Sequence, residues 1–332
     1  MTGRWANLAL AVLVPTATAS GFLMFAFGSG GPVWPVAAFH GASALAILVL
    51  VPWKRPVVQR GLARVTRPGR ATSVALVWVV LVALLSGLAH VVGLSLQETA
   101  ITTMQLHVTA GILATAVTVV HTRQRPVRIR RVDRSRRALL SAGLVLGAAG
   151  VATAVVQGIG YLATGSGIRR ATGSLRLASS RVDAIPSTSW LFDAVPTLDA
   201  DAYRLTTTVA GATRTWSRTE LAAFHDEVTA VLDCTGGWWT EQTWSGVRVA
   251  RLVGSGVTTI VVTSDTGYQR RLPLTQDLLL ATAVGGLPLD AGHGAPVRLV
   301  VPGRRGYHWV KWVTSVEVET SPWWLEPPLP LR

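Results

Sequence analysis

The sequence predicts a protein of two parts: an N-terminal all-α bundle of five membrane spans and a C-terminal α+β domain that is mainly β. First, residues 5–53 contain no Lys, Arg, Asp or Glu. A water-exposed surface of that length needs charged groups to stay hydrated, so this region belongs in lipid. Second, residues 1–164 carry fifteen basic and two acidic residues, whereas the remainder carries sixteen basic and fifteen acidic residues, so the charge also divides the chain into two parts. Third, a Gly, Ser and Arg-rich linker at 165–185 precedes a polar, strand-rich stretch, so we expect the second domain over 186–332.

Five apolar runs in the first part are each long enough to cross about 30 Å of hydrocarbon. The first run has only Arg4 before it and four further runs after it, which indicates an anchor rather than a cleaved signal peptide. We therefore predict five spans over residues 1–164. The runs lie at about 5–27, 33–53, 72–94, 100–121 and 138–163.

Basic residues in the first part are concentrated between spans. Six lie in Lys54–Arg70 and eight in Arg123–Arg137. This is the positive-inside pattern, which places both loops and the N-terminus in the cytoplasm. The Gly28–Pro32 and Gly93–Thr99 connections then face outward, and the fifth span delivers the C-terminal domain outside. We expect a multi-pass plasma-membrane protein with lipid as a partner. A nucleic-acid partner is not expected, since it would need basic residues on an exposed face of the polar domain.

Local signals outline the C-terminal domain. Ser217, with Glu220 three residues later, forms a capping box that opens a short helix ending near His225. Runs of β-branched residues separated by Gly and Pro turns then predict strands. A domain of about 145 residues can bury an adequate core. The expected strands are Thr229–Asp233, Thr258–Thr263, Val297–Val301 and Val313–Val318.

Cys234 is the only cysteine. It cannot form an internal disulfide, so it is either a buried small hydrophobic residue or a thiolate ligand. Gly236 and Gly237 follow it and allow the backbone to approach a bulky group, while a thiolate suits a soft or redox-active metal. A closed zinc site is not expected, because no second Cys exists and the histidines are not at zinc-finger spacing. The tryptophans that could enclose the site are Trp238, Trp239 and Trp244.

A second cluster places five basic side chains within a short, glycine-rich segment. Cationic donors and free backbone N–H groups at tight turns are what a phosphate-bearing ligand needs. The alternative is a solvated basic turn. The five residues are Arg298, Arg304, Arg305, His308 and Lys311.

In their order along the chain and in their residues, the two clusters resemble motifs of the sulfite-oxidase-like family of molybdopterin-dependent oxidoreductases. The resemblance covers roughly residues 186–320. The combination of segments is far more specific than any one of them. The segments that carry the resemblance are one ending in Trp190, Asp201–Leu205, the Cys234 segment closed by Trp244–Val247, the Ser264–Tyr268 turn, His293–Arg298 and Val301–Trp312.

The resemblance implies a sulfite-oxidase-like molybdopterin-binding domain in which the Cys234 thiolate binds molybdenum. The other implied residues contact the pterin and its phosphate, some of them through backbone atoms. A buried structural role is the alternative for each. These cofactor-binding residues are His293, Arg298, Trp309, Val310 and Lys311, with Ser264 and Thr188 as further hydroxyl contacts.

Departures from the family pattern bear on the small-molecule substrate. Sulfite-oxidising members carry arginines beside the cysteine segment, whereas Thr, two Gly and two Trp follow Cys234 here. Sulfite is therefore disfavoured, and reduction of an S-oxide or N-oxide is expected. The chain ends soon after Trp324, without the dimerisation domain of classical sulfite oxidases, so monomeric behaviour is expected.

Histidines in the membrane part are candidate ligands of one haem b that would carry electrons to the cofactor. His40 and His107 each lie about seven residues from the outer end of a span, hence at similar depth. His121 follows His107 by fourteen residues, but the equivalent position after His40 is Lys54, so a second haem is not expected. His90 could substitute as a ligand. The alternative is hydrogen-bonded histidines in a plain anchor, and the expected electron partner is a quinone or another membrane carrier.

The segment Ser135–Leu140 (Ser-Arg-Arg-Ala-Leu-Leu) precedes the last span and resembles a twin-arginine export motif, which would carry a folded, cofactor-loaded domain across the membrane. The alternative is an ordinary positive flank of a span. Two other functions stay open at this stage: a non-catalytic membrane protein whose outer domain binds a partner or ligand, and a carrier of electrons through haem alone.

Overall fold

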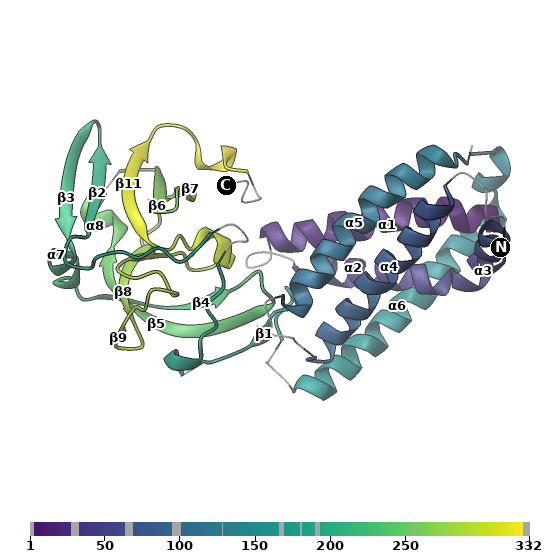
Figure 1. Cartoon of the computed structure of the whole chain (residues 1–332), viewed down its shortest axis with the longest axis horizontal. Helices are drawn as coiled ribbons and strands as arrows, with labels where there is room; N and C mark the ends of the chain where they lie inside the picture. Colours follow the sequence, from purple (N-terminus) through teal and green to yellow (C-terminus); the bar gives the residue numbers. More distant parts are fainter. Residues whose placement is uncertain are drawn as a thin grey trace. The chain divides into compact units, whose positions relative to one another are not determined.

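The computed structural model describes residues 3–27, 33–63, 69–94, 101–127, 129–165, 169–179, 181–189, 193–254 and 256–327. The chain divides into two compact units, Met1–Leu175 and Arg176–Arg332, and the division falls within the stretch expected to be a linker. The first unit is helical and the second mainly β (Figure 1). Trp190, the whole Gly28–Pro32 connection and most of Gly93–Thr99 lie outside the described residues.

Four helices of the first unit are long and apolar enough to cross a membrane: α1, α4, α5 and α6. The expected second span is broken into α2 and α3, which are bent by 53° and count as a fifth span only if taken together. The break falls at Leu50, before Pro52 in the first turn of α3, because proline lacks the N–H that a continuous helix needs. The helices are α1 (Gly3–Phe27), α2 (Val33–Val49), α3 (Val51–Leu62), α4 (Arg70–Val91), α5 (Thr103–Gln124), the 3-10 turn η1 (Arg131–Arg134) and α6 (Arg136–Thr164).

Small side chains as well as leucines and valines form the core of the helical unit, while many large apolar side chains face outward. Ala46 of α2 and Ala149 of α6 are fully buried, whereas Leu144 and Leu162 of α6 are 72% and 84% exposed. Exposed apolar surface of this extent indicates association with a membrane. Ser135 caps α6 by accepting a hydrogen bond from the Ala138 N–H at 3.3 Å, so it has a structural role whether or not it belongs to an export motif.

The second unit contains two sheets. In one, β1, β5, β8 and β10 follow in this order, β4 pairs with β5 and β9 with β8; in the other the order is β3, β2, β11, β6 and β7. The pairing of β11 with β2 is parallel, and the other registered pairs are antiparallel. The strands are β1 (Leu175–Arg176), β2 (Arg204–Val209), β3 (Ala212–Ser217), β4 (Asp226–Asp233), β5 (Trp238–Arg248), β6 (Thr259–Ser264), β7 (Gln269–Pro273), β8 (Leu279–Val284), β9 (Leu287–Pro288), β10 (Arg298–Val300) and β11 (Val313–Glu319).

Helical turns are short in this unit. The capping box predicted at Ser217 is present, with the Glu220 N–H donating to Ser217 Oγ at 3.2 Å, but α7 ends at Ala222 rather than near His225. The four predicted strands correspond to β4, β6, β10 and β11. The remaining helical elements are α7 (Arg218–Ala222), α8 (Val249–Val253), η2 (Val182–Ala184), η3 (Gly306–His308) and η4 (Trp323–Leu325).

The long strand β5 is not among the predicted strands, because its tryptophans were interpreted as enclosing the cysteine site. It pairs with β4 along its length and with β8 on its other side. At Gly246 the pairing with β8 shifts register, and a Cβ there would lie 2.1 Å from the Leu280 carbonyl oxygen. The β4–β5 hairpin thus lies within the sheet, and the turn that joins its strands carries Cys234.

Candidate functional site

Cys234 lies in the tight turn between β4 and β5. Its N–H donates to the Trp238 carbonyl at 2.8 Å, and the Gly237 N–H donates to the Cys234 carbonyl at 3.2 Å. Gly237 has a φ of 91°, a conformation that favours glycine. The Gly236 N–H donates to Cys234 Sγ at 3.3 Å. The turn therefore holds the thiol in a defined position at the end of the hairpin.

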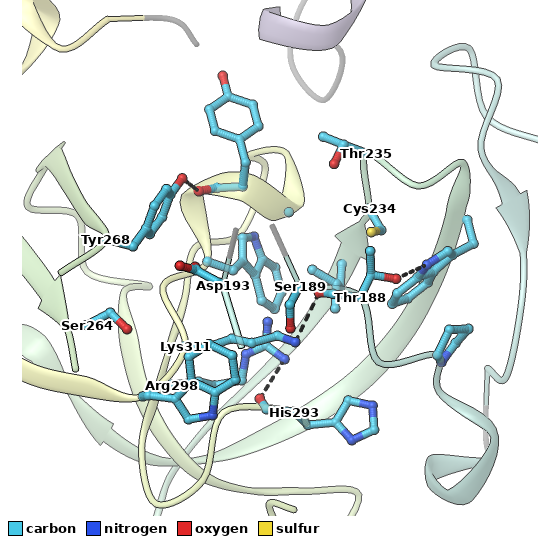
Figure 2. A pocket seen from close by; sticks show the side chains of 17 residues that line it. Thr188, Ser189, Asp193, Cys234, Thr235, Ser264, Tyr268, His293, Arg298 and Lys311 are labelled. Atoms are coloured by element: carbon cyan, nitrogen blue, oxygen red, sulfur yellow. Dashed lines mark hydrogen bonds between the residues drawn. The ribbon is translucent and has the colours of Figure 1, made fainter. Parts of the chain in front are cut away.

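The thiol lines a pocket whose empty space, with the open solvent at its mouth included, is about 750 Å³. Strands of both sheets and the loops between them line the pocket. Figure 2 shows Cys234, Thr188 and Lys311 around this space, with Ser264 farther from the thiol. The candidate residues that line the pocket are Thr188, Cys234, Ser264, His293, Arg298, Trp309 and Lys311.

Burial dominates the chemistry of the free thiol. Cys234 is 9% exposed, and burial raises the pKa of its thiol, while the Gly236 N–H, the Arg305 charge, Thr188 and Lys311 act in the opposite direction. A buried, protonated thiol is a weak nucleophile, but a coordinated metal ion stabilises the thiolate strongly enough to displace the proton. The position of the thiol suits a metal ligand better than a free nucleophile.

Two cations, the buried Arg298 and the half-buried Lys311, point toward the same cavity (Figure 2). Arg298 Nη1 donates to the His293 carbonyl at 3.0 Å, and Lys311 Nζ donates to the carbonyls of Thr188, at 3.0 Å, and Gly292. Burial lowers the pKa of Arg298 to about 10 and that of Lys311 to about 7.

Neither cation forms an ion pair with a carboxylate within the described part of the chain. The Nε atom of Arg298 is buried without a hydrogen-bond partner there. A buried cation in this state is costly unless an anion completes its surroundings. The donor set of Arg298 and Lys311 therefore fits an anionic group such as a phosphate.

Tryptophans form much of the pocket wall. Trp238, Trp309 and Trp312 line it, whereas Trp244 is fully buried in the core. The Arg298 guanidinium lies 5.0 Å from the centroid of the Trp244 ring and 5.7 Å from that of Trp309. Cation–π contacts of this kind help a guanidinium to remain charged away from water. The rings thus position the Arg298 charge as well as enclosing the cavity.

The His293 side chain has a structural role in this conformation. Its Nδ1 lies 2.7 Å from Asp290 Oδ2 and its Nε2 lies 2.9 Å from the Ile185 carbonyl, so both ring nitrogens are engaged. Its carbonyl, by contrast, orients Arg298. Val310 is 1% exposed and does not line the pocket. Any contact of these two residues with a cofactor would be limited to backbone atoms.

The two hydroxyl residues differ in their proximity to the thiol. Thr188 Oγ1 accepts a hydrogen bond from Trp238 Nε1 at 3.2 Å and contributes to the environment of Cys234. Ser264 lies at the end of β6, with Oγ 3.2 Å from Thr266 Oγ1. Both residues line the pocket, Ser264 from the end of β6 and Thr188 from the loop before β2.

The basic cluster is only partly directed at the pocket. Arg305, expected among the phosphate-binding cations, instead forms a buried ion pair with Asp233, the residue before Cys234. Arg304 lies 5.3 Å from the Trp323 ring centroid and is not a lining residue. The spacing of the cluster could not show this, because Asp233 and Arg305 are 72 positions apart.

Asp193, Tyr268 and Tyr307 also line the pocket, and sequence reasoning gave them no role of their own. Tyr268 donates a 2.5 Å hydrogen bond to the Tyr307 carbonyl, which joins the β6–β7 turn to the segment that carries Lys311. The Ser264–Tyr268 turn was part of the recognised pattern, but Asp193 had no sequence signal. Among the described residues no group of three or more His, Cys, Asp or Glu side chains could hold a metal ion.

In the helical unit, His40 of α2 and His107 of α5 approach each other, with ring centroids 5.9 Å apart. His90 lies elsewhere, its Nε2 2.8 Å from the Gly173 carbonyl. His121 Nδ1 lies 3.4 Å from Thr72 Oγ1. The pair proposed as ligands on the basis of depth therefore meets in space.

Comparison with known proteins supports the interpretation of the second unit. Residues 192–324 match the family described as the oxidoreductase molybdopterin binding domain. The chain is 30% identical to mitochondrial sulfite oxidase of Rattus norvegicus over 168 residues and 30% identical to that of Homo sapiens over 166 residues. Both matches cover 38% of this chain but only 31% and 30% of the relatives, so it spans less than a third of their length.

Among solved structures, the sulfane dehydrogenase SoxCD from Paracoccus pantotrophus matches with 24% identity and a TM-score of 0.36, over 38% of this chain and 40% of that chain. The family match and the sulfite oxidase relatives together support a sulfite-oxidase-like molybdopterin-binding domain in the second unit.

Proposed function

We propose that this chain, with its sulfite-oxidase-like molybdopterin-binding domain, is a membrane-anchored oxidoreductase that binds molybdenum through Cys234 and transfers oxygen atoms outside the cytoplasm. One observation carries the proposal: the only thiol of the chain opens onto the same pocket as two cations, one buried and one half-buried, that lack carboxylate partners among the described residues. A soft metal ligand and an anion site in one cavity match the two ends of a molybdenum–pterin cofactor.

Each side chain of the pocket has a distinct role in this proposal. The turn from Cys234 to Gly237 presents Sγ to the metal, and the β4–β5 hairpin fixes its position. Lys311 and Arg298 hold the pterin phosphate, while Trp309 covers the pterin and restricts water. Val310 and His293 contribute backbone atoms. The bound cofactor supplies two-electron oxygen-atom transfer.

The charges at the pocket favour a neutral substrate. Arg298 and Lys311 are the cations among the lining residues, and both are assigned to the phosphate. The other polar lining groups include the carboxylate of Asp193 and the hydroxyls of Ser189 and Thr235. Sulfite, an anion, would lack a dedicated cation, whereas the oxygen of an S-oxide or N-oxide can accept a hydrogen bond from a hydroxyl. Reduction of such an oxide is therefore the favoured reaction.

Electrons for this reduction would come from a membrane carrier such as a quinol and enter through the helical unit. The proposed orientation has the basic loops and the N-terminus in the cytoplasm and the catalytic domain outside. Reporter fusions test it: a periplasmic phosphatase fused at the C-terminus is expected to be active, and one fused within Arg123–Arg137 is expected to be inactive. The opposite pattern would refute the orientation.

Metal analysis of the full-length protein in detergent tests the cofactor. We expect molybdenum in the wild-type protein from a host that makes the cofactor, and its loss from Cys234→Ala. The matched control is Thr229→Ala, an exposed position on β4, the strand that leads to Cys234, and this variant should keep the metal. Absence of molybdenum from the wild type, or equal contents in Cys234→Ala and the control, would refute the assignment and favour a non-catalytic binding domain.

Turnover assays then address the substrate. Viologen-dependent reduction of dimethyl sulfoxide, methionine sulfoxide and trimethylamine N-oxide is compared with ferricyanide-dependent oxidation of sulfite. Reduction of at least one oxide, lost in Cys234→Ala, is the expected result. Sulfite oxidation without oxide reduction would overturn the substrate assignment while leaving the cofactor assignment intact.

A further inference from the structure

Two imidazoles from helices far apart in the sequence meet inside the helical unit. His40 belongs to α2 and His107 to α5, and their ring centroids lie 5.9 Å apart with an angle of 87° between the ring planes. Ionisable side chains within apolar helices are costly and are therefore associated with function. Two of them in one place indicate a shared ligand.

Hydrogen bonds fix the tautomer of both rings in the same sense. His40 Nδ1 lies 2.9 Å from the Ala17 carbonyl, and His107 Nδ1 lies 2.8 Å from the Ala83 carbonyl. A carbonyl only accepts, so each Nδ1 carries the proton and each Nε2 is left with a lone pair. Neither Nε2 has a hydrogen-bond partner within the described residues. A backbone carbonyl on one ring nitrogen is the usual support of an imidazole that binds metal through the other.

The separation of the rings matches a single metal ion between them. A metal held by two Nε2 atoms places the ring centroids roughly 6 Å apart, because each metal–nitrogen bond is about 2 Å long. Two perpendicular imidazole planes can both contain the axis that joins the nitrogens. The observed centroid distance of 5.9 Å is close to this value.

The number of ligands identifies the kind of metal group. Zinc in proteins takes three or four protein ligands, and the described residues contain no cluster of three or more His, Cys, Asp or Glu side chains. A haem brings its own four equatorial nitrogens and requires only axial ligands from the protein. Two histidines without a third ligand thus fit a haem and not a simple metal ion.

Glycines give each imidazole its space. A Cβ at Gly87 of α4 would lie 2.9 Å from Cε1 and Nδ1 of His107, and a Cβ at Gly21 of α1 would lie 3.3 Å from Cε1 of His40. Gly111 of α5 is different, since the nearest atom to its Cβ would be Thr18 Oγ1 at 4.0 Å. The ring of His107 therefore depends on the absence of a side chain at Gly87 but not at Gly111.

We propose that Nε2 of His40 and Nε2 of His107 are the axial ligands of one b-type haem in the helical unit. The ferric iron takes up one electron from a reduced membrane carrier, such as a quinol, and releases it to an acceptor, so two such transfers match one two-electron reaction. His121 is not a ligand. The inference deepens the electron route of the proposed function, but its evidence is independent of Cys234.

Absorption spectra of the full-length protein, purified in detergent from a haem-replete host, test the proposal. We expect a low-spin b-type spectrum upon reduction with dithionite, its reoxidation by ferricyanide, and one haem b per chain. His40→Ala and His107→Ala should each lower the haem content by about ten-fold or more. His121→Ala, on the same helix as His107, is the matched control and should retain the haem.

Two further measurements separate ligation from a mere folding defect. Imidazole added to His107→Gly should restore the low-spin spectrum, because it occupies the vacated position. Gly87→Ala should shift the spectrum or lower the haem content, whereas Gly111→Ala should do neither. Ferric wild-type protein should give the strongly anisotropic low-spin EPR signal of perpendicular axial imidazoles, in keeping with the 87° between the rings.

Several results would overturn the inference: no haem in the wild type, a high-spin ferric signal, normal haem content in either His→Ala variant, or equal loss in His121→Ala. Failure of the molybdenum assignment is distinguishable from all of these. In Cys234→Ala the haem spectrum should persist while molybdenum is lost, and a haem spectrum in a protein that never binds molybdenum would indicate an electron carrier.

Discussion

The buried ion pair beside the thiol offers the most direct test of how the site is held. Asp233 is 1% exposed and Arg305 is 5% exposed, and a backbone bridge joins the same two residues. The pair ties the end of β4 to the segment before η3. We predict that Arg305→Met destabilises the domain, because it leaves the Asp233 carboxylate buried without this cation.

Removal of one partner from a buried pair costs about 3–5 kcal/mol, against about 5–15 kcal/mol for a whole domain. The loss should therefore be about a fifth or more of the stability. Replacement of both partners, in Asp233→Leu with Arg305→Met, should restore most of it, since no buried charge then remains. The Cys234 turn follows Asp233 directly, so molybdenum content should fall in the single variant and recover in part in the double variant.

Urea unfolding of the full-length protein in detergent, followed by tryptophan fluorescence, measures the effect. Nine of the thirteen tryptophans follow Arg176, so the signal reports mainly on the second unit. A cost below about 1 kcal/mol for Arg305→Met, or a double variant no more stable than the single one, would refute the reasoning.

Three further predictions concern the second unit and use the same unfolding assay. Gly246→Ala should cost about 3 kcal/mol or more, since its Cβ would meet the Leu280 carbonyl oxygen at 2.1 Å; a neutral effect would show that the register shift adjusts freely. Ser217→Ala should cost about 1 kcal/mol through loss of the capping box with Glu220, and no measurable cost would contradict that role. Burial, followed by the Arg298 charge, lowers the pKa of Lys311 from 10.5 to about 7, so between these values the unfolded chain binds more protons and the stability of cofactor-free protein rises with pH. Lys311→Met should reduce this slope, and an unchanged slope would refute the assignment.

Local sequence features were sufficient where the structure depends on neighbouring residues. The charge-free stretch 5–53 indicated apolar helices because the length of an apolar run is itself the constraint. The capping box at Ser217 and the strand β4 were predictable because a helix cap and an alternating strand are each defined within a few neighbouring positions.

One local break and the features that depend on distant partners were not predicted. The bend at Leu50 reflects the local effect of Pro52, but hydropathy treated the segment as one continuous run. The strand β5 was not predicted, because tryptophans indicate burial but do not identify the strands that pair with them. The position of Arg305 was not predicted, because the sequence of the basic cluster does not indicate that Arg305 pairs with the distant Asp233 carboxylate.

The sequence alone determined the kinds of chemistry available: a single thiol, a basic glycine-rich segment and histidines in apolar helices. The tertiary structure decided how these groups are combined. It brought Cys234, Arg298 and Lys311 to one pocket, assigned Arg305 to Asp233, and placed His40 opposite His107. The physical reason is that residue type and local pattern fix what a group can bind, whereas burial and pairing are set by contacts between segments far apart in the chain.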